Sequence, residues 1–434
     1  MAIYGLSNLG GNAGMYGGIY GGGGLYSLIG AFSPYDYDPS LYFDAQESML
    51  SAMQNPTLDL DPSKPDTLNV ITATRSGVAT YTDAAGLIQS ASADTVRVDH
   101  VDGVPMILVE PSATNLVPTS VPNSNWSVQG ATITENFSTS PEGQQTATKV
   151  IKSGDSQNDR TFIESLAIAS GTEYTVSVYL KNIDVANHTT VGVRITSGTL
   201  FRIKYQWDSG VIGSLNGTSY NRFAVDVGDG WYRVGFTFTA DGTSTGIEVD
   251  VDRDSGTYTD TSSILLWGAQ LELGPVSTSF IKTTSGAVTR AADDYKIVGS
   301  DFSDFYNQSE GTIYVEFVPK EVTTVTFIYE ASDTSNERIY SRVGSSDSLK
   351  VSDGETQASI TAGTASLVML NRLAASFKQN NFQVAVNGTA GTPDISGSLP
   401  SVTFINIGSN FAGGNQLNGH IKRMIYWPYH SDSL

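Results

Sequence analysis

Ser262–Lys296 reads SSILLWGAQLELGPVSTSFIKTTSGAVTRAADDYK, and this stretch divides the chain into its parts. Its first half carries apolar side chains on both faces, a pattern that predicts a strand buried on both sides. With strict alternation, one face carries Ile264, Leu266, Gly268 and Gln270, and the other carries Leu265, Trp267, Ala269 and Leu271. Gly274-Pro275 ends the strand, so we expect one domain to close here and the next to open beyond it.

The composition favours an all-β protein of two or three domains. The chain has 434 residues, of which 39% are hydrophobic and only 16% are charged, while Gly, Ser and Thr are abundant. A net charge of −20 disfavours nucleic acid and anionic lipid as partners. Cysteine is absent, which excludes disulfides and thiolate metal sites, so we expect large cores or oligomerisation to stabilise the fold.

The sequence shows no targeting or membrane-spanning signal. No apolar run reaches the length of about 18 residues that a membrane helix needs, so we expect no membrane insertion. The first basic residue is Lys64, and the N-terminus therefore lacks the positive region of a signal peptide. We expect the chain to be made in the cytoplasm and incorporated into a larger assembly there.

The first 33 residues combine glycine runs with single large aromatic side chains. The tyrosines among them are Tyr4, Tyr16, Tyr20 and Tyr26. Rigid aromatics between flexible glycines suit an extended N-terminal anchor that threads into a partner's groove, whereas a disordered leader is the alternative. A capping box at 44–47 predicts one short helix, and the three prolines within 56–66 predict a stiff linker.

Alternating apolar and polar side chains further along the chain predict half-buried antiparallel strands. The segments 174–181 and 232–239 alternate in this way before the dividing stretch, and 312–317 does so after it. The segment 372–388 reads as a hairpin. These patterns predict two β-sandwiches, one on each side of the dividing stretch.

Several phrases in the sequence resemble known families. WGAQLELG and TSFIKTTSGAVTRAAD, within 267–293, resemble a phrase that recurs in phage tail fibre, tail spike and other virion surface proteins, where it ends a carbohydrate-binding-module-like β-sandwich. The segment 74–117, with ILVEP and TNL near its end, resembles one that precedes that sandwich in the same proteins. EGTIYVEF and RLAASFKQNNFQVAVNG, within 310–388, are similar to the concanavalin A-like, laminin-G-like lectin fold.

Patterns and resemblances together imply a domain order. We expect an all-β chain with two antiparallel jelly-roll or lectin-like β-sandwiches, preceded by the anchor and one short helix. The expected parts are the Gly/Tyr-rich virion anchor and linker at 1–66, a β-rich connecting segment at 67–118, the carbohydrate-binding-module-like sandwich at 119–292 and the laminin-G-like sandwich at 293–434.

The resemblance also implies a function. It indicates a structural component of a phage particle, a tail fibre or spike subunit, held to other virion proteins by its N-terminus and recognising a host-surface glycan. A homotrimer at the particle surface is part of that expectation. The alternative is an architectural decoration or cement protein of capsid or tail with no sugar binding. A third hypothesis is a polysaccharide depolymerase spike.

The sequence offers candidate sugar-binding residues, because a sugar needs an aromatic platform beside amide and carboxylate hydrogen-bond partners. The candidates are Trp126, Trp207 and Trp231 in the first sandwich, and Asn410, Phe411, Asn415, Gln416 and Tyr429 in the second. Loops at one end of a sandwich commonly carry binding residues. The alternatives are core packing for each tryptophan and a simple turn cluster for the asparagine-rich loop.

A row of acidic residues is the candidate metal site. Glu248, Asp250 and Asp252 alternate with apolar residues, which places three carboxylates on one face of a strand. Oxygen ligands at that density suit Ca²⁺, while the alternative is a solvated outer face in a protein with surplus acid. We expect no other cofactor.

No catalytic residues are predicted. The 44 acidic residues show no spacing that selects the carboxylate pair of a glycosidase, and none of the four histidines lies near a G-x-S-x-G motif. Zinc is disfavoured by the lack of cysteine and of paired histidines. We therefore expect a binding protein that is not an enzyme.

Overall fold

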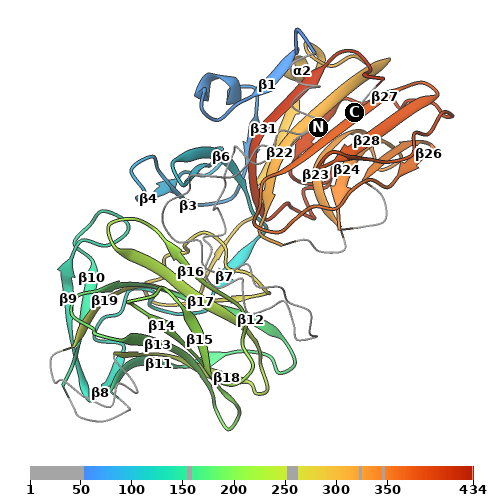
Figure 1. The fold of residues 1–434 in the computed structure, drawn as a ribbon. Helices are drawn as coiled ribbons and strands as arrows, with labels where there is room; N and C mark the ends of the chain where they lie inside the picture. The colour runs from blue at the N-terminus through green and yellow to red at the C-terminus, as the bar shows by residue number, and fades with distance from the viewer. Residues whose placement is uncertain (1–52, 154–158, 252–261, 322–324, 345–347, 433) are drawn as a thin grey trace, which may run out of the picture.

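Two β-sandwiches form the two lobes of an elongated molecule (Figure 1). The computed structural model describes residues 53–153, 159–251, 262–321, 325–344, 348–432 and 434. The four anchor tyrosines, the capping box at 44–47 and Asp252 lie outside the described residues.

The first sandwich consists of two six-stranded sheets whose neighbouring strands are antiparallel. Sheet 1 has the order β16 (Tyr220–Asp226), β17 (Trp231–Thr239), β12 (Glu173–Asn182), β19 (Ser263–Leu273), β10 (Ala147–Lys152) and β9 (Ala131–Ser138). Sheet 2 has the order β15 (Ile212–Asn216), β14 (Leu200–Gln206), β13 (His188–Ile195), β18 (Ser244–Val251), β11 (Arg160–Ala167) and β8 (Ser127–Gln129). The inward side chains of both sheets form one apolar core.

The second sandwich is built from an eight-stranded and a seven-stranded sheet. Sheet 3 has the order β29 (Thr389–Ala390), β28 (Asn381–Val386), β27 (Asn371–Lys378), β22 (Glu310–Pro319), β31 (Gly419–Trp427), β6 (Val104–Val109) and β5 (Val98–Val101), and β1 (Leu58–Leu60) also pairs with β31. Sheet 4 has the order β2 (Thr72–Thr74), β21 (Asp294–Val298), β30 (Phe404–Ile407), β23 (Thr326–Thr334), β24 (Glu337–Val343), β25 (Leu349–Asp353) and β26 (Glu355–Ile360).

The segment expected to connect the parts is built into the second sandwich. β5 and β6 extend sheet 3 beside β31, and β2 pairs with β21 at the edge of sheet 4. The chain therefore begins this sandwich, builds the first sandwich, and returns to complete the second. Local patterns could show that 67–118 forms strands, but they could not show which distant strands these would join.

Short elements complete the described structure. They are η3 (Pro65–Leu68), the hairpin of β3 (Ala79–Thr82) and β4 (Ile88–Ala91), the pair β7 (Ala113–Asn115) and β20 (Val288–Arg290), and the helix α2 (Gly299–Ser303). The predicted all-β fold with two antiparallel sandwiches is confirmed. None of the helices in the described ranges has the length and apolar character needed to cross a membrane.

Strand β19 is buried on both faces, as its sequence predicts, but its two faces exchange near the middle. Its side chains are buried from Ser263 to Glu272. Ile264 and Leu266 lie in the core of the first sandwich, and beyond Gly268 the residues in that core are Ala269 and Leu271. Strict alternation would place the latter two on the opposite face.

The exchange follows from a bulge at Gly268. The pairing of β19 with β12 shifts register at this point, and Gly268 has a φ of +62°. A Cβ atom here would lie 2.7 Å from the ring of Tyr179, so the close approach also favours glycine. The predicted faces therefore hold as far as Trp267 and are wrong beyond it.

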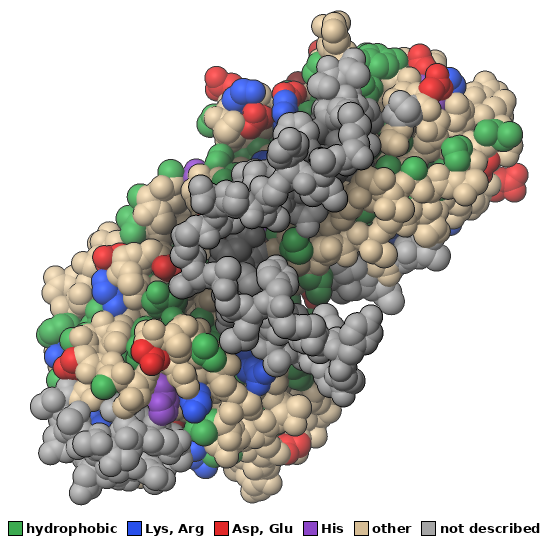
Figure 2. All heavy atoms as spheres, in the orientation of Figure 1, with side chains coloured by type: hydrophobic (Ala, Val, Ile, Leu, Met, Phe, Trp, Pro, Cys, Tyr) green, Lys and Arg blue, Asp and Glu red, His purple; other side chains and the backbone are tan. Residues whose placement is uncertain are grey.

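The described surface mixes both signs of charge on the face seen in Figure 2. Acidic and basic side chains are interspersed there rather than gathered into one patch.

Candidate functional site

Two of the three predicted tryptophan platforms are core residues. Trp126 is 3% exposed and donates its indole N–H to the carbonyl oxygen of Thr119 at 3.0 Å. Trp231 is 2% exposed and packs in a small apolar cluster on the other face of sheet 1. The structure thus corrects the prediction for both residues, because a buried ring offers no face on which a sugar could stack.

Trp207 is the half-buried member of the three. It follows β14 at one end of the first sandwich, and its indole N–H donates to Thr189 Oγ1 at 3.0 Å. Its ring meets those of Tyr205 and Tyr232 at centroid distances of 4.9 and 6.1 Å. These contacts hold the ring in place at the end of the sandwich, where it stays partly accessible.

The asparagine-rich loop between β30 and β31 is stabilised by its own amides. Asn410 Oδ1 accepts hydrogen bonds from the backbone N–H groups of Ala412 and Gly414 at 3.0 and 2.9 Å, and Gln416 Nε2 donates to the carbonyl oxygen of Gly413. Asn415 is exposed and has a φ of +50°. The alternative of a turn cluster therefore describes Asn410 and Gln416 better than sugar binding does.

Phe411 and Tyr429 lie in different surroundings. Phe411 is half-buried, and its backbone N–H donates to Glu330 Oε2 at 3.1 Å. Tyr429 packs against an apolar cluster that contains Tyr314 and Trp427, and its hydroxyl donates to the carbonyl oxygen of Gln54 at 2.7 Å. Tyr429 is therefore not part of the same loop site as Phe411.

Glu248 and Asp250, the two described members of the predicted carboxylate row, lie on the outer face of sheet 2 beside several arginines. Glu248 is 2% exposed and pairs with Arg160 at 3.0 Å, with Arg194 at 3.2 Å and with Arg202. Asp250 is buried beside it. Neither carboxylate is exposed to solvent, and three guanidinium groups balance the charge of Glu248. The described ranges contain no cluster of three metal-binding side chains, and calcium binding stays a prediction.

Strand register explains why these side chains meet. Phe162 on β11 lies opposite Glu248 on β18, which lies opposite Gly192 on β13, which lies opposite Arg202 on β14. A Cβ atom at Gly192 would lie 2.8 Å from Glu248 Cγ and 2.9 Å from Arg202 Cγ. The glycine therefore provides the space in which the carboxylate and the guanidinium pair across the intervening strand.

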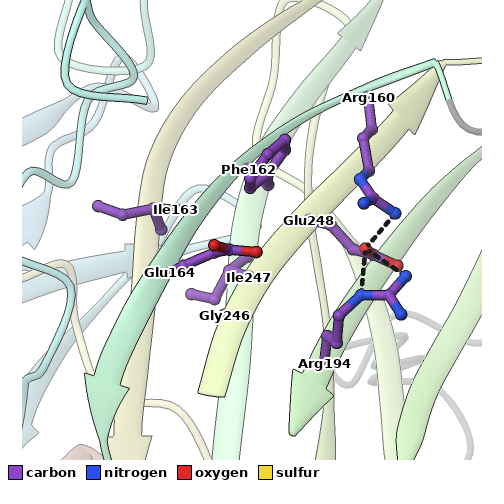
Figure 3. A pocket seen from close by; sticks show the side chains of 8 residues that line it. All are labelled: Arg160, Phe162, Ile163, Glu164, Arg194, Gly246, Ile247 and Glu248. Carbon is purple, nitrogen blue, oxygen red and sulfur yellow. Dashed lines mark hydrogen bonds and ion pairs between the residues drawn. The ribbon is translucent and has the colours of Figure 1, made fainter. Parts of the chain in front are cut away.

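A shallow pocket opens beside this cluster, and Figure 3 shows its lining. The residues are Arg160, Phe162, Ile163, Glu164, Arg194, Gly246, Ile247 and Glu248. Arg160 and Arg194 converge on Glu248 at one side, while Glu164 lies toward the other. The Arg160 guanidinium lies 5.1 Å from the centre of the Phe162 ring, and the Arg194 side chain is 42% exposed.

The pocket combines the groups that a sugar requires. Phe162 supplies a half-buried aromatic ring, Arg194 supplies exposed donors, and Glu164 supplies an exposed acceptor. Sequence reasoning missed all three residues. Alternation in the segment 160–164, with outward Arg160, Phe162 and Glu164, was a signal that could have found Phe162 and Glu164, whereas Arg194 lies on another strand, β13.

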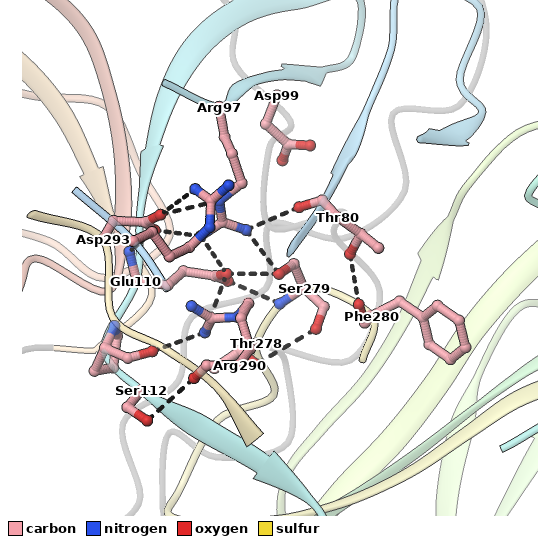
Figure 4. Close-up of polar contacts among 12 residues, drawn as sticks. Thr80, Arg97, Asp99, Glu110, Ser112, Thr278, Ser279, Phe280, Arg290 and Asp293 are labelled. Atoms are coloured by element: carbon pink, nitrogen blue, oxygen red, sulfur yellow. Dashed lines mark hydrogen bonds and ion pairs between the residues drawn. The ribbon is translucent and has the colours of Figure 1, made fainter. Parts of the chain in front are cut away.

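A second polar cluster, which we call the joint, connects the two sandwiches (Figure 4). Glu110 follows β6, and its carboxylate accepts from the backbone N–H and the hydroxyl of Ser279, which follows β19, at 2.8 and 2.7 Å. The same carboxylate pairs with Arg97 at 3.0 Å, Arg290 at 3.4 Å and Lys320 at 3.0 Å. One carboxylate thus links the sheets of both lobes.

Asp293 is the second acid of the joint. It pairs with Arg75 at 3.0 Å and also with Arg97, and it accepts from the backbone N–H of Glu110 at 2.9 Å. The side chains of all four residues are 0% exposed. Burial favours the neutral form of Arg97, but Glu110 and Asp293 outweigh it and raise the pKa of the guanidinium above its ordinary value.

The joint is built from the phrases quoted in the sequence analysis. Arg75, Glu110, Ser279, Arg290 and Asp293 come from TRSG, ILVEP, TSFIK and TRAAD. Asn115 of TNL donates to the carbonyl oxygens of Ala269 and Ile281, and its own oxygen accepts from the N–H of Leu271. These phrases encode an internal connection rather than a ligand site.

The comparisons with known proteins return no sequence family. No protein-family profile matches the chain, and no curated protein matches it. Among solved structures, the chain is similar to the CBM22-1–GH10 modules of Clostridium thermocellum endo-1,4-β-D-xylanase 10B, complexed with xylohexaose, at 15% identity and a TM-score of 0.24. That alignment covers 39% of this chain and 29% of the xylanase chain.

Two further structures are similar over more of the chain. Mouse laminin α1 domains LG4-5 match at 13% identity and a TM-score of 0.21, covering 71% of this chain and 92% of that one. The tandem CBM22-1–CBM22-2 domain of Paenibacillus barcinonensis Xyn10C matches at 9% identity and a TM-score of 0.26, covering 74% and 97%. We draw no function from similarities at these scores.

Proposed function

We propose that this protein is a structural component of a phage particle, a tail fibre or spike subunit, that recognises a host-surface glycan without cleaving it. The observation that carries glycan recognition is the pocket on the outer face of sheet 2. There an aromatic ring, exposed guanidinium donors and an exposed carboxylate lie around one shallow depression.

The chemistry of each group suits a pyranose. The apolar face of the sugar would lie on the Phe162 ring, because C–H groups pack well on an aromatic surface. Arg194 would donate to one hydroxyl, and Glu164 would accept from another. Glu248 is buried and engaged by three arginines, so it is not placed to reach a glycosidic bond, and we propose binding without hydrolysis.

The virion assignment is supported by the sequence phrases and by what they build. The shared phrases form the joint that holds the two sandwiches together, as a projecting fibre module would require. We further propose that the Gly/Tyr-rich N-terminus anchors the chain to other virion proteins and that the assembly is a homotrimer, which sedimentation of the purified chain would test. An architectural role without sugar binding is the alternative.

One experiment separates these functions. The purified chain is incubated with envelope polysaccharide from candidate hosts, with and without Ca²⁺, and retention and newly formed reducing ends are measured together. Phe162→Ala should weaken retention about tenfold, because it removes the stacking face. Phe137→Ala is the matched control, since Phe137 is 48% exposed and carries Lys149 at 5.0 Å from its ring centre.

Each outcome is decisive for one hypothesis. Retention that falls with Phe162→Ala and not with Phe137→Ala supports the pocket. New reducing ends would show that the polysaccharide is cleaved, and would overturn the proposal of binding without hydrolysis in favour of a depolymerase. If no polysaccharide is retained on a panel that includes the true host, the architectural role without sugar binding becomes the favoured function. Loss of retention on chelation would support a cation bound near Glu248.

A further inference from the structure

A second polar patch lies in the other sandwich, on the outer face of sheet 4. Glu330 on β23 lies opposite Asn406 on β30, and Ser332 follows two positions after Glu330 on the same face. Ala331 and Ile405 point the other way, into the core. Asn406, Glu330 and Ser332 are each 0% exposed, so three polar side chains form the floor of this patch.

Several polar atoms of the patch lack partners in the described part of the chain. Asn406 Oδ1, Ser332 Oγ and Arg338 Nε are buried and accept or donate no hydrogen bond there. Arg338 lies directly opposite Ser332 in the register of β24 with β23. A buried polar atom left unpaired destabilises the fold, so three on one patch need an explanation. A hydroxyl-bearing ligand would satisfy these atoms, because each hydroxyl both donates and accepts.

Aromatic side chains stand at the rim of the same patch. Phe404 is half-buried beside Asn406 on β30, and Lys296 Nζ lies 5.8 Å from its ring centre. Phe411 is also half-buried, and its backbone N–H donates to Glu330 Oε2 at 3.1 Å. The patch therefore pairs a polar floor with apolar rims, as carbohydrate sites do.

Arg338 covers part of this floor. Its guanidinium lies 4.9 Å from the ring centre of Tyr340, and Nη1 donates to Glu330 Oε1 at 3.4 Å. The side chain is 24% exposed and has a long flexible stem. Rotation of this side chain toward solvent would uncover Glu330 and Ser332 without moving the backbone.

We propose that this patch is a second carbohydrate site, which binds a sugar residue with vicinal hydroxyls. Glu330 and Asn406 receive one hydroxyl pair, Ser332 contacts the next hydroxyl, and Phe404 packs on the ring. The site is independent of the Phe162 pocket, since it lies in the other sandwich. Because the joint connects the two sandwiches, one polysaccharide strand that reaches both sites would be held with increased avidity.

The test uses the full chain on an array of neutral hexose, N-acetylhexosamine and uronic acid oligosaccharides, followed by calorimetric titration of each sugar retained. Phe162→Ala is the background, so that the first pocket does not contribute. Ser332→Ala removes a buried hydroxyl that bonds no described protein group, so the thermal midpoint should stay the same or rise while affinity falls about tenfold. Phe404→Ala should have a similar effect on affinity.

Ser341→Ala is the matched control. Ser341 lies in the same sandwich, and its hydroxyl donates to Tyr329 within the core at 3.1 Å. This change should lower the thermal midpoint and leave affinity unchanged. The proposal is overturned if no sugar binds in the Phe162→Ala background, which would leave ordered water as the partner of the unpaired atoms. It is also overturned if adding Ser332→Ala or Phe404→Ala to the Phe162→Ala background does not weaken sugar binding.

Discussion

Glu110 in the joint and Glu330 on sheet 4 are both completely buried glutamates, and their surroundings differ in charge. Burial is the largest influence on each carboxyl, and by itself it would raise the pKa of both. In the joint, one lysine and two arginines outweigh burial and hold the pKa of Glu110 well below its ordinary value. On sheet 4, Arg338 does not offset burial, and the pKa of Glu330 is raised.

The comparison separates two uses of a buried acid. Glu110 is satisfied by cations, a hydroxyl and backbone N–H groups, so its burial serves the connection between sandwiches. Glu330 has one long guanidinium contact and accepts from one backbone N–H. A saturated buried charge indicates a structural role, while an undersaturated one indicates a place for a ligand.

The largest expected effect comes from breaking the joint. Arg97→Met leaves Glu110 and Asp293 without their shared cation, and loss of one partner from a buried pair costs about 3–5 kcal/mol of unfolding free energy. Urea unfolding followed by tryptophan fluorescence measures the change. Lys181→Met is the control, because it breaks an ion pair with Asp229, whose side chain is 80% exposed, at a cost of at most about 1 kcal/mol. Equal losses in the two variants would contradict the structural role of the joint.

An intermediate effect is expected from acid. The unfolded chain binds a proton at Glu110 more readily than the folded chain does, because the folded pKa is lowered. The stability from Glu110 is therefore complete above the unfolded pKa of about 4.3 and is lost as the pH falls through the folded pKa. Glu110→Gln should be less stable than wild type near pH 7, and the difference should shrink on acidification. A difference that stays constant between pH 7 and pH 3 would show that the charge of Glu110 contributes nothing.

The smallest effect is expected at Glu330, and it has the opposite sign. With a raised folded pKa, the contribution of Glu330 is most favourable below the unfolded pKa and declines as the pH rises through the folded pKa. Glu330→Gln keeps an acceptor for the N–H of Phe411 and removes the buried charge. It should gain up to about 1 kcal/mol relative to wild type as the pH rises toward neutrality. If Glu330→Gln is clearly less stable than wild type at neutral pH, Glu330 has a structural role like that of Glu110.

Much of the fold could be predicted from local patterns. The alternation in 174–181 and 232–239 predicted strands that became β12 and β17, and the apolar run after Ser262 predicted the doubly buried β19. The bulge at Gly268 could not be predicted, since it depends on the Tyr179 ring packed against that glycine. A local pattern does not reveal which neighbour will occupy the space.

The candidate sites were predicted less well. Tryptophan was the natural sugar platform, but Trp126 and Trp231 are large apolar side chains that the core buries. Glu248 was recognised as unusual, yet its partners Arg160, Arg194 and Arg202 lie on other strands. The row of acids therefore suggested a metal site, whereas the strand register places arginines from neighbouring strands next to Glu248.

The sequence by itself determined the all-β class and the position of the dividing stretch, because alternation and turn residues act over a few neighbouring positions. Only the tertiary structure decided what the phrases TRSG, ILVEP, TSFIK and TRAAD do. Arg75 and Asp293 are separated by 218 positions, and Glu110 and Ser279 by 169, yet both pairs meet in the joint. Ion pairs and sheet register between such distant residues depend on how the strands are ordered in space, and that order follows from burying the two cores together.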